Sequence, residues 1–518
     1  MPSRKLPYAS VATFSIMRRD NYAYVDKTAI IHKMLNDYRI VFFARPRRFG
    51  KSLTCSTLES IFKGQRELFK GLAIDSLPWD WKEYPVLHIS LTGANYSTGA
   101  SAVAEKINRV IDEQATQYGI AIPQGGISNR FAALMNLLYE AKGEICVIID
   151  EYDKPLLETL GEPAHDEIKN ELKSFYEVLK GCDKYLKFVF ITGITKFAQV
   201  SMFSGLNQPK DISFELDCSE LCGIAQTELE IFFEPEINEY SARYGGKEEY
   251  LARLKNYYNG YKFSGKANSV YNPVSLMNHF GDGNFRAYWA ETGTPSFLAK
   301  YIGKQGTDIV EIENVVLPAE AFGKYGENEV SLVPLLYQAG YLTITDYNEI
   351  TGLYTLNYPN TEVRNSFADF LSSKYSGIET IKSKSLLAKL INSLLAGDCE
   401  NFMNSMKIYM SGIKYDLVTK ITEYYFEFAF GNILNMLGVS CEIEVHTNIG
   451  SVDAVIKLAN NVYIIEAKLD KPINEAIDQI EKKQYYLPYL NKGCNIFKIA
   501  VVFGKAERNI VEWKAFSA

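Results

Sequence analysis

Short, continuous apolar runs alternate with stretches of helical periodicity over the first two hundred residues. Apolar runs of this length predict strands that are buried on both faces of a parallel sheet. The predicted strands are residues 39–44, 86–91, 145–149 and 188–192. Helical spacing runs from Ser52 to Phe62. Strands separated by helices indicate right-handed crossovers, and therefore an α/β domain with a parallel sheet.

The pattern changes between about residues 206 and 400. Here shorter, aromatic-rich helical segments are interrupted by turn-forming pairs such as Asn259-Gly260 and Asn272-Pro273. We expect a mostly helical middle region.

From about residue 421 the pattern predicts a helix, three strands, a second helix and a last strand. The corresponding segments are 421–437, 442–447, 451–458, 462–469, 473–490 and 496–503. This order predicts a compact α/β unit at the end of the sequence.

Length and composition agree with a chain of several globular domains. The 518 residues are 47% apolar and 23% charged, and a chain this long usually forms more than one core. We predict domains at 1–205, 206–400 and 401–518. Because the net charge is -7, binding to nucleic acid would need locally clustered lysine and arginine.

The first residues, the lengths of the apolar runs and the cysteine spacing suggest a cytoplasmic protein without a membrane partner. Residues 1–7 lack the apolar core of a secretory signal, and no uninterrupted apolar run reaches about 18 residues. Neither the histidines nor the cysteines have the spacing of a metal site. They are His32, His88, His165, His279 and His446, and Cys55, Cys146, Cys182, Cys218, Cys222, Cys399, Cys441 and Cys494.

A candidate phosphate site follows the first predicted strand. In Gly50-Lys51-Ser52 a glycine, a lysine and a hydroxyl open a helix, and this combination binds nucleotide phosphates and Mg²⁺. Asp150 and Glu151 end a later strand, where the first acid would hold Mg²⁺ and the second would polarise the attacking water. Thr192, at the end of another strand, is a weaker candidate for a contact with the γ-phosphate.

A second candidate site lies in the last unit. Glu466 and Lys468 are two residues apart on one strand and so share a face, and Asp453 on the neighbouring strand can reach them. Two carboxylates and a lysine in this arrangement indicate a metal-dependent phosphodiesterase. An ion pair between Glu466 and Lys468 on an exposed strand is the alternative.

Four motifs together resemble the AAA-ATPase-like family that carries a C-terminal PD-(D/E)XK nuclease domain, and the resemblance spans nearly the whole chain. The motifs are Tyr24-Val25-Asp26-Lys27-Thr28, Arg45-Pro46-Arg47-Arg48-Phe49-Gly50-Lys51-Ser52, Asp150-Glu151-Tyr152-Asp153-Lys154-Pro155 and Tyr271-Asn272-Pro273. The resemblance implies a P-loop NTPase sheet, a helical middle region and a restriction-endonuclease-like α/β domain. It also implies bound ATP and Mg²⁺.

The resemblance extends both sets of site residues. An arginine in place of the usual first glycine is normal for this family, so we assign the nucleotide site to Arg45, Arg48, Phe49, Gly50, Lys51, Ser52 and Leu53, with Asp150 and Thr192. Glu423 is expected as a further metal ligand of the nuclease site, with Glu427 as the competing choice. Gln479 and Tyr485 would support that site from the next helix. Ser451 stands where the family often has arginine. The loss of this phosphate contact lowers the expected affinity for substrate.

These features predict an ATP-dependent or ATP-regulated nuclease that acts on DNA with Mg²⁺ or Mn²⁺. Glu151, Asp453, Glu466 and Lys468 are the expected catalytic residues, and Ser52, Asp150, Asp453, Glu466 and Glu423 are the expected metal ligands. One alternative is an ATP-driven switch whose last domain binds nucleic acid without cutting it, and another is a signalling ATPase. Whether the chain forms a homo-oligomer is open.

Overall fold

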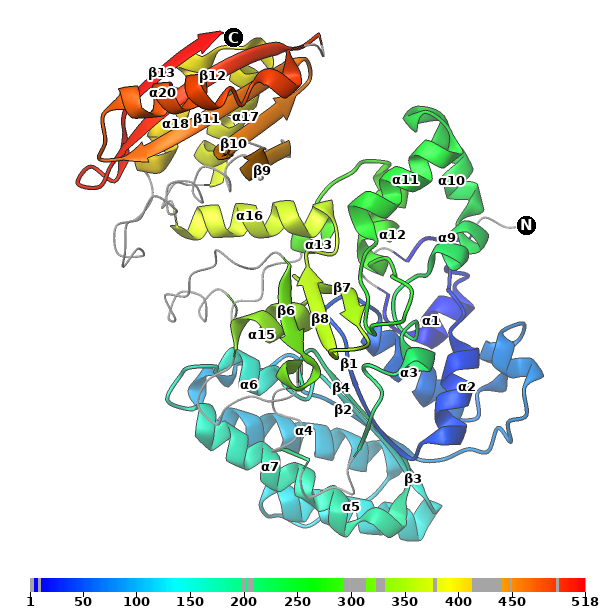
Figure 1. The fold of residues 1–518 in the computed structure, drawn as a ribbon. Helices are drawn as coiled ribbons and strands as arrows, with labels where there is room; N and C mark the ends of the chain where they lie inside the picture. Colours follow the sequence, from blue (N-terminus) through cyan, green and yellow to red (C-terminus); the bar gives the residue numbers. More distant parts are fainter. Residues whose placement is uncertain are drawn as a thin grey trace. The chain divides into compact units, whose positions relative to one another are not determined.

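The protein divides into two compact units, Met1–Val363 and Arg364–Ala518. The computed structural model describes residues 4–7, 11–196, 202–203, 209–291, 298, 314–322, 331–375, 380–411, 440–447, 450–490 and 493–517 (Figure 1). The three predicted domain ranges remain a prediction beside this two-part division.

A five-stranded parallel sheet forms the centre of the first unit. Its strands are β1 (Ile40–Ala44), β2 (Val86–Ser90), β3 (Ile145–Asp150), β4 (Leu186–Gly193) and β5 (Lys210–Asp211), in the order β2-β3-β4-β1-β5. The four predicted strands are confirmed. The sequence analysis missed β5, because a strand of two residues, of which neither is fully buried, leaves no apolar run.

Helices cover both faces of this sheet. The helices before residue 200 are α1 (Phe14–Arg19), α2 (Thr28–Asp37), α3 (Lys51–Phe62), α4 (Ala100–Tyr118), α5 (Ile127–Lys142), α6 (Lys154–Glu158) and α7 (His165–Gly181). Alternate strand residues such as Leu87 and Val147 share one buried cluster with α4, α5 and α7, which lie together in Figure 1. The other face packs on α3, where Phe62 contacts Phe188.

The remainder of the first unit is helical with a small added sheet. The helices are α9 (Gln226–Phe232), α10 (Glu234–Ser241), α11 (Lys247–Tyr258), α12 (Pro273–Asp282), α13 (Tyr288–Glu291) and α15 (Leu332–Ala339), and α16 (Thr361–Tyr375) crosses the unit boundary. An antiparallel sheet of β6 (Val315–Pro318), β8 (Leu353–Asn357) and β7 (Thr343–Asn348) was not predicted. Many of its side chains are exposed or only half-buried, so these strands lack continuous apolar runs.

The second unit contains a five-stranded mixed sheet. Its strands are β9 (Ser440–Thr447), β10 (Gly450–Leu458), β11 (Asn461–Leu469), β12 (Asn495–Gly504) and β13 (Asn509–Ser517), in the order β13-β12-β11-β10-β9. Helix α20 (Ile473–Lys483) joins the parallel strands β11 and β12. The predicted strands and this helix are confirmed, although α20 ends before residue 490. The predicted helix at 421–437 lies outside the described residues.

The last strand, β13, was missed. It pairs antiparallel with β12, and most of its side chains are exposed or half-buried, so no apolar run identifies it.

Two helices contribute to the core of the second unit in the part of the chain that the structure describes. Leu390 and Leu394 of α17 (Thr380–Ala396) and Phe402 and Met406 of α18 (Cys399–Ser411) share a buried cluster with Tyr463 of the sheet. This core therefore includes residues before position 401. No described helix is both long and apolar enough to cross a membrane.

Candidate nucleotide and nuclease sites

The loop between β1 and α3 has the backbone of a phosphate-binding loop. Gly50 caps α3 with φ 104°, a conformation in which glycine is unstrained, and Arg48 is left-handed with φ 67°. Lys51 Nζ donates hydrogen bonds of 2.9 Å to the carbonyls of Arg45 and Pro46. Burial lowers the pKa of this lysine, while the carboxylates of Asp150 and Glu151 act in the opposite direction. The lysine is thus held inside the loop.

Ser52 and Asp150 meet beneath the loop. Because β1 and β3 are both parallel to β4, the residues after their carboxyl ends lie at one edge of the sheet. Ser52 Oγ donates a hydrogen bond of 2.7 Å to Asp150 Oδ2. A serine hydroxyl and an aspartate at this position are the oxygen ligands that Mg²⁺ takes in P-loop proteins, so the residues present fit the ion.

Glu151 stands beside this pair in a strained conformation. Its φ is 54°, which is uncommon for a residue with a side chain. Lys154 Nζ lies 3.7 Å from Glu151 Oε2 and 3.3 Å from Glu158 Oε1. The lysine therefore holds the carboxylate that was predicted to polarise water.

A pocket of about 410 Å³ opens over the loop. Its lining comes from the phosphate loop, the acidic strand end, the first helix with the segment before it, and the helical region. These residues are Pro7, Val11, Ala12, Met17, Arg47, Arg48, Gly50, Lys51, Ser52, Leu53, Glu151, Lys154, Pro273, Val274, Met277, Trp289 and Tyr341. The lining residues before Arg47 and after Lys154 were not predicted as site residues. Most of them are ordinary apolar side chains that only the fold brings to the loop.

The motif Tyr271-Asn272-Pro273 places one wall of the pocket. Asn272 is fully buried, and its Oδ1 accepts hydrogen bonds from Val274 N and Ser275 N at the start of α12. Asparagine at this position satisfies backbone donors that a helix leaves open. Trp289 of α13 donates from Nε1 to the Arg47 carbonyl at 3.3 Å, which joins the helical region to the phosphate loop.

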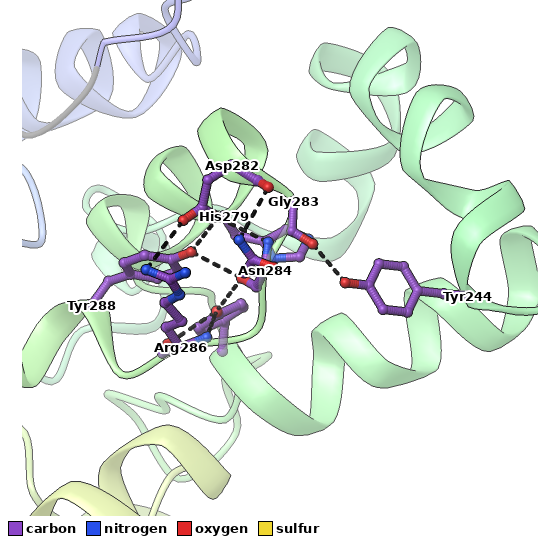
Figure 2. A network of polar contacts seen from close by, with 8 residues as sticks. Tyr244, His279, Asp282, Gly283, Asn284, Arg286 and Tyr288 are labelled. Atoms are coloured by element: carbon purple, nitrogen blue, oxygen red, sulfur yellow. Dashed lines mark hydrogen bonds and ion pairs between the residues drawn. The ribbon is translucent and has the colours of Figure 1, made fainter.

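The connection between α12 and α13 is a network of polar contacts, shown in Figure 2. His279 Nδ1 donates to the Asn284 carbonyl at 2.7 Å, and Tyr244 donates to the Gly283 carbonyl at 2.6 Å. Tyr288 donates to Asp282. Because these contacts fix the turn between the helices, the pocket residues on α12 and α13 are held at a set separation.

Four predicted nucleotide-site residues do not line the pocket: Asp150, which meets Ser52, and Arg45, Phe49 and Thr192. Arg45 is buried between the rings of Phe43 and Phe263 and donates to backbone carbonyls, including those of Ser213 and Cys218. Phe49 packs beneath the loop against Tyr261 and Phe263. Both side chains brace the loop from inside.

Thr192 is the last of these four residues. Its hydroxyl donates to the Phe43 carbonyl on β1 at 2.7 Å, and the side chain is fully buried. In this arrangement the hydroxyl links two strands. Asp153 holds the segment that follows β4, since its carboxylate accepts from Ile194 N, Thr195 N and Thr195 Oγ1.

The carboxylates and the lysine of the second candidate site come together on the sheet of the second unit. Asp453 on β10 accepts from Ala467 N on β11 at 2.7 Å. Lys468 Nζ donates to Glu466 Oε1 at 2.7 Å. Glu466 is 0% exposed, and within the described part of the chain its Oε2 has no hydrogen-bond partner.

The electrostatics of Glu466 suit a cation site and not an exposed ion pair. Burial, and then the charge of Asp453, raise the pKa of Glu466 to about 7, against the opposing effect of Lys468. A buried carboxylate oxygen without a partner is costly unless a cation or a proton satisfies it. Oxygen ligands of this kind fit a hard divalent metal.

Only some of the other residues predicted for the nuclease site lie within the described part of the chain. Gln479 Nε2 of α20 donates to Tyr485 Oη at 3.4 Å, so the two predicted supporting residues contact each other. Glu423 and Glu427 lie outside the described residues, as does the side chain of Ser451.

The fold and the phosphate loop define a P-loop protein with a second, nuclease-like unit, and the comparisons agree. The chain matches a family model described as predicted AAA-ATPase over residues 7–203 and one described as PD-(D/E)XK nuclease superfamily over residues 421–513. An uncharacterized protein in the vnfD 5' region of Azotobacter chroococcum mcd 1 is 33% identical over 523 residues, covering 99% of this chain and 98% of that protein. The chain belongs to the AAA-ATPase-like family with a C-terminal PD-(D/E)XK nuclease domain.

Solved structures resemble the chain only distantly. The Aeropyrum pernix ORC2 protein (ADPNP-ADP complexes) has a TM-score of 0.30 and 12% identity, covering 85% of this chain and 90% of that chain. The Aeropyrum pernix ORC1 protein in complex with DNA has a TM-score of 0.25 and 11% identity, covering 69% and 96% respectively. Scores this low carry no argument about this chain.

The raised pKa of Glu466 predicts a pH-dependent stability of the metal-free second unit. The folded pKa of about 7 exceeds the unfolded value of about 4.3, so the folded state retains a proton that the unfolded chain releases. Stability should fall as the pH rises between these values and level off above them. Glu466→Gln should therefore stabilise the protein by about 1–3 kcal/mol at pH 8 and have little effect near pH 4.

Urea unfolding in EDTA, followed by hydrogen exchange of β11 and β12 peptides, measures this difference. The matched control is Glu475→Gln, which changes an exposed glutamate on α20. Equal stability of wild type and Glu466→Gln at both pH values would show that Glu466 is not a buried, destabilising carboxylate.

Proposed function

We propose that this protein binds and hydrolyses ATP with Mg²⁺ and uses the nucleotide to control a metal-dependent nuclease that acts on DNA. The observation that carries the proposal is that one chain contains both a Ser52–Asp150 pair beneath a lysine-bearing phosphate loop and a buried glutamate with an unsatisfied oxygen next to Asp453 and Lys468.

The nucleotide half of the proposal rests on the pocket over α3. Lys51 would exchange its two loop carbonyls for phosphate oxygens, and the amide groups at the start of α3 would bind the same phosphates. Ser52 and Asp150 would hold Mg²⁺, which offsets the charge on the β- and γ-phosphates. Glu151, once released from Lys154, would orient the attacking water.

The nuclease half rests on the second unit. Asp453 and Glu466 would hold one or two divalent ions, and Glu423 is the proposed further ligand. Such ions supply hydroxide at neutral pH and stabilise the charge of the pentavalent phosphate. Lys468 would offset charge beside the reacting phosphate, while Gln479 and Tyr485 would pack against the carboxylates.

A buried glutamate offers a connection between the nucleotide pocket and the helix that leaves the first unit. Glu362, in the first turn of α16, is 0% exposed. Its Oε1 accepts from Trp289 N at 2.8 Å and its Oε2 accepts from Ser275 Oγ at 2.8 Å. Since α12 and Trp289 line the pocket, nucleotide binding would act on the start of α16 through this carboxylate.

The remaining parts of the proposal are a cytoplasmic location and a nucleic-acid partner. If the wild-type protein binds nucleic acid but does not cut it in Mg²⁺ or Mn²⁺, the switch that binds without cutting is favoured.

The first prediction concerns nucleotide binding. Lys51→Ala should weaken the binding of Mg²⁺–ATP by at least about tenfold, because it removes the one lysine that the loop encloses. Isothermal titration with full-length protein measures the affinity, and Lys70→Ala, at an exposed lysine, is the control. Unchanged affinity in Lys51→Ala would refute the phosphate-loop assignment.

The second prediction concerns cleavage. Asp453→Asn keeps the shape of the side chain and its hydrogen bond from Ala467 N, yet removes the charge that would bind metal. It should reduce cleavage of plasmid and linear DNA by about a hundredfold or more in Mg²⁺ or Mn²⁺, with ATP binding retained. Asp478→Asn, at an exposed position on α20, should cut like wild type, and EDTA should stop both. Full activity of Asp453→Asn would exclude this metal site.

The third prediction concerns the connection through Glu362. Glu362→Gln keeps one accepting oxygen for Trp289 N but removes the charge and places an amide donor against the Ser275 hydroxyl, which must then accept, so this hydrogen bond is weakened. ATP affinity should stay within about threefold of wild type, whereas the ratio of cleavage rates with and without ATP should move towards one. Glu349→Gln, on the exposed turn after β7, is the control. A folded Glu362→Gln protein with the wild-type ratio would disprove this route.

A further inference from the structure

Three potential metal ligands meet on the α3 face of the first sheet. Cys55 comes from α3, His88 from β2 and Asp150 from the end of β3. The Cys55 sulfur, a ring nitrogen of His88 and a carboxylate oxygen of Asp150 all lie within 4.8 Å of one another. These residues are far apart in sequence, which is why cysteine and histidine spacing did not predict a metal site.

A fourth residue fixes the orientation of the His88 ring. His88 Nδ1 lies 3.0 Å from Glu59 Oε2. Glu59 Oε1 also forms an ion pair with Lys63 Nζ at 2.6 Å, which favours the ionised carboxylate. An ionised carboxylate can only accept, so Nδ1 is the donor and the neutral ring has its free lone pair on Nε2.

Two polar atoms of this cluster lack hydrogen-bond partners. Within the described residues, His88 Nε2 and Asp150 Oδ1 are buried without a partner, whereas Asp150 Oδ2 accepts from Ser52. Asp150 is 4% exposed and Cys55 is 0% exposed. A buried polar group without a hydrogen-bond partner destabilises the folded state. An ion or a water between these side chains would satisfy both atoms.

We propose that Cys55, His88 and Asp150 bind a divalent transition-metal ion of the zinc class. A thiolate, an imidazole and a carboxylate are the ligands zinc takes, and this mixture selects zinc, cobalt or nickel over Mg²⁺. The ion would be held by the Cys55 sulfur, His88 Nε2 and one Asp150 oxygen, with a water in the fourth position. The thiol proton leaves to solvent as the metal–sulfur bond forms.

The surroundings of the cluster match a metal centre in one further respect. Metal-binding histidines usually donate their second ring N–H to a carboxylate, which sets the tautomer and the ring orientation. Glu59 fills this role for His88. The His88 side chain is 26% exposed, whereas its Nε2, Cys55 and Asp150 are buried.

An ion at this site would act on the nucleotide pocket. Asp150 would then serve both the transition metal and, through its contact with Ser52, the phosphate loop. The site itself does not depend on the proposed ATP use, because all three of its ligands are protein side chains.

Cobalt titration of full-length, chelator-treated protein without nucleotide tests the proposal. Co²⁺ bound to a thiolate gives a near-ultraviolet charge-transfer band, which carboxylate sites such as that around Glu466 do not give. We expect a band intensity that corresponds to one thiolate-bound Co²⁺ per chain, and loss of the band on adding Zn²⁺. Cys55→Ser should abolish the band, and His88→Asn and Glu59→Gln should each weaken binding by at least about tenfold.

Cys146→Ser is the matched control, because it changes another buried cysteine on β3 and should leave the band unchanged. If Cys55→Ser does not fold, His88→Asn and Glu59→Gln still report on the site. Absence of the band in wild type, its persistence in folded Cys55→Ser, or wild-type affinity in His88→Asn would each overturn the proposal.

Discussion

The hydrogen bond between Ser52 and Asp150 is the constraint on which the first unit depends. It requires β1 and β3 to end at the same edge of the parallel sheet, and α3 to begin directly after the phosphate loop. Arg45 and Phe49 hold the loop from beneath, so Lys51 can face the loop carbonyls while the pocket opens above. The parallel order of β1, β4 and β3 places these groups at that edge.

The helical region supplies one wall of the nucleotide pocket, which the sheet alone does not provide. Asn272 sets the start of α12, the network around His279 sets the turn to α13, and Trp289 contacts the phosphate loop. Glu362 then ties these helices to the start of α16. A buried carboxylate with two fixed donors tolerates little displacement, and so it suits the transmission of a change in the pocket to the following helix.

The sequence was most informative where chemistry requires particular residues at fixed spacing. Lys51, Ser52 and Asp150 follow buried strands, and Glu466 and Lys468 share a strand face, so local pattern was enough to predict these contacts. The structural roles of Arg45, Phe49 and Thr192 were not predictable, because a motif does not reveal which way a side chain points. The weakly patterned strands β5, β6 and β13, and the meeting of Cys55 with His88, depend on tertiary pairing that leaves no local pattern.

The central claim is that nucleotide binding in the first unit controls cutting by the second. Its most direct test is the rate of DNA cleavage by wild-type protein at fixed Mg²⁺ while ATP is varied. The account predicts a rate that changes with ATP and saturates over the same concentrations that saturate ATP binding. A cleavage rate that is independent of ATP across that range, or no cleavage of any DNA with or without ATP, would contradict it.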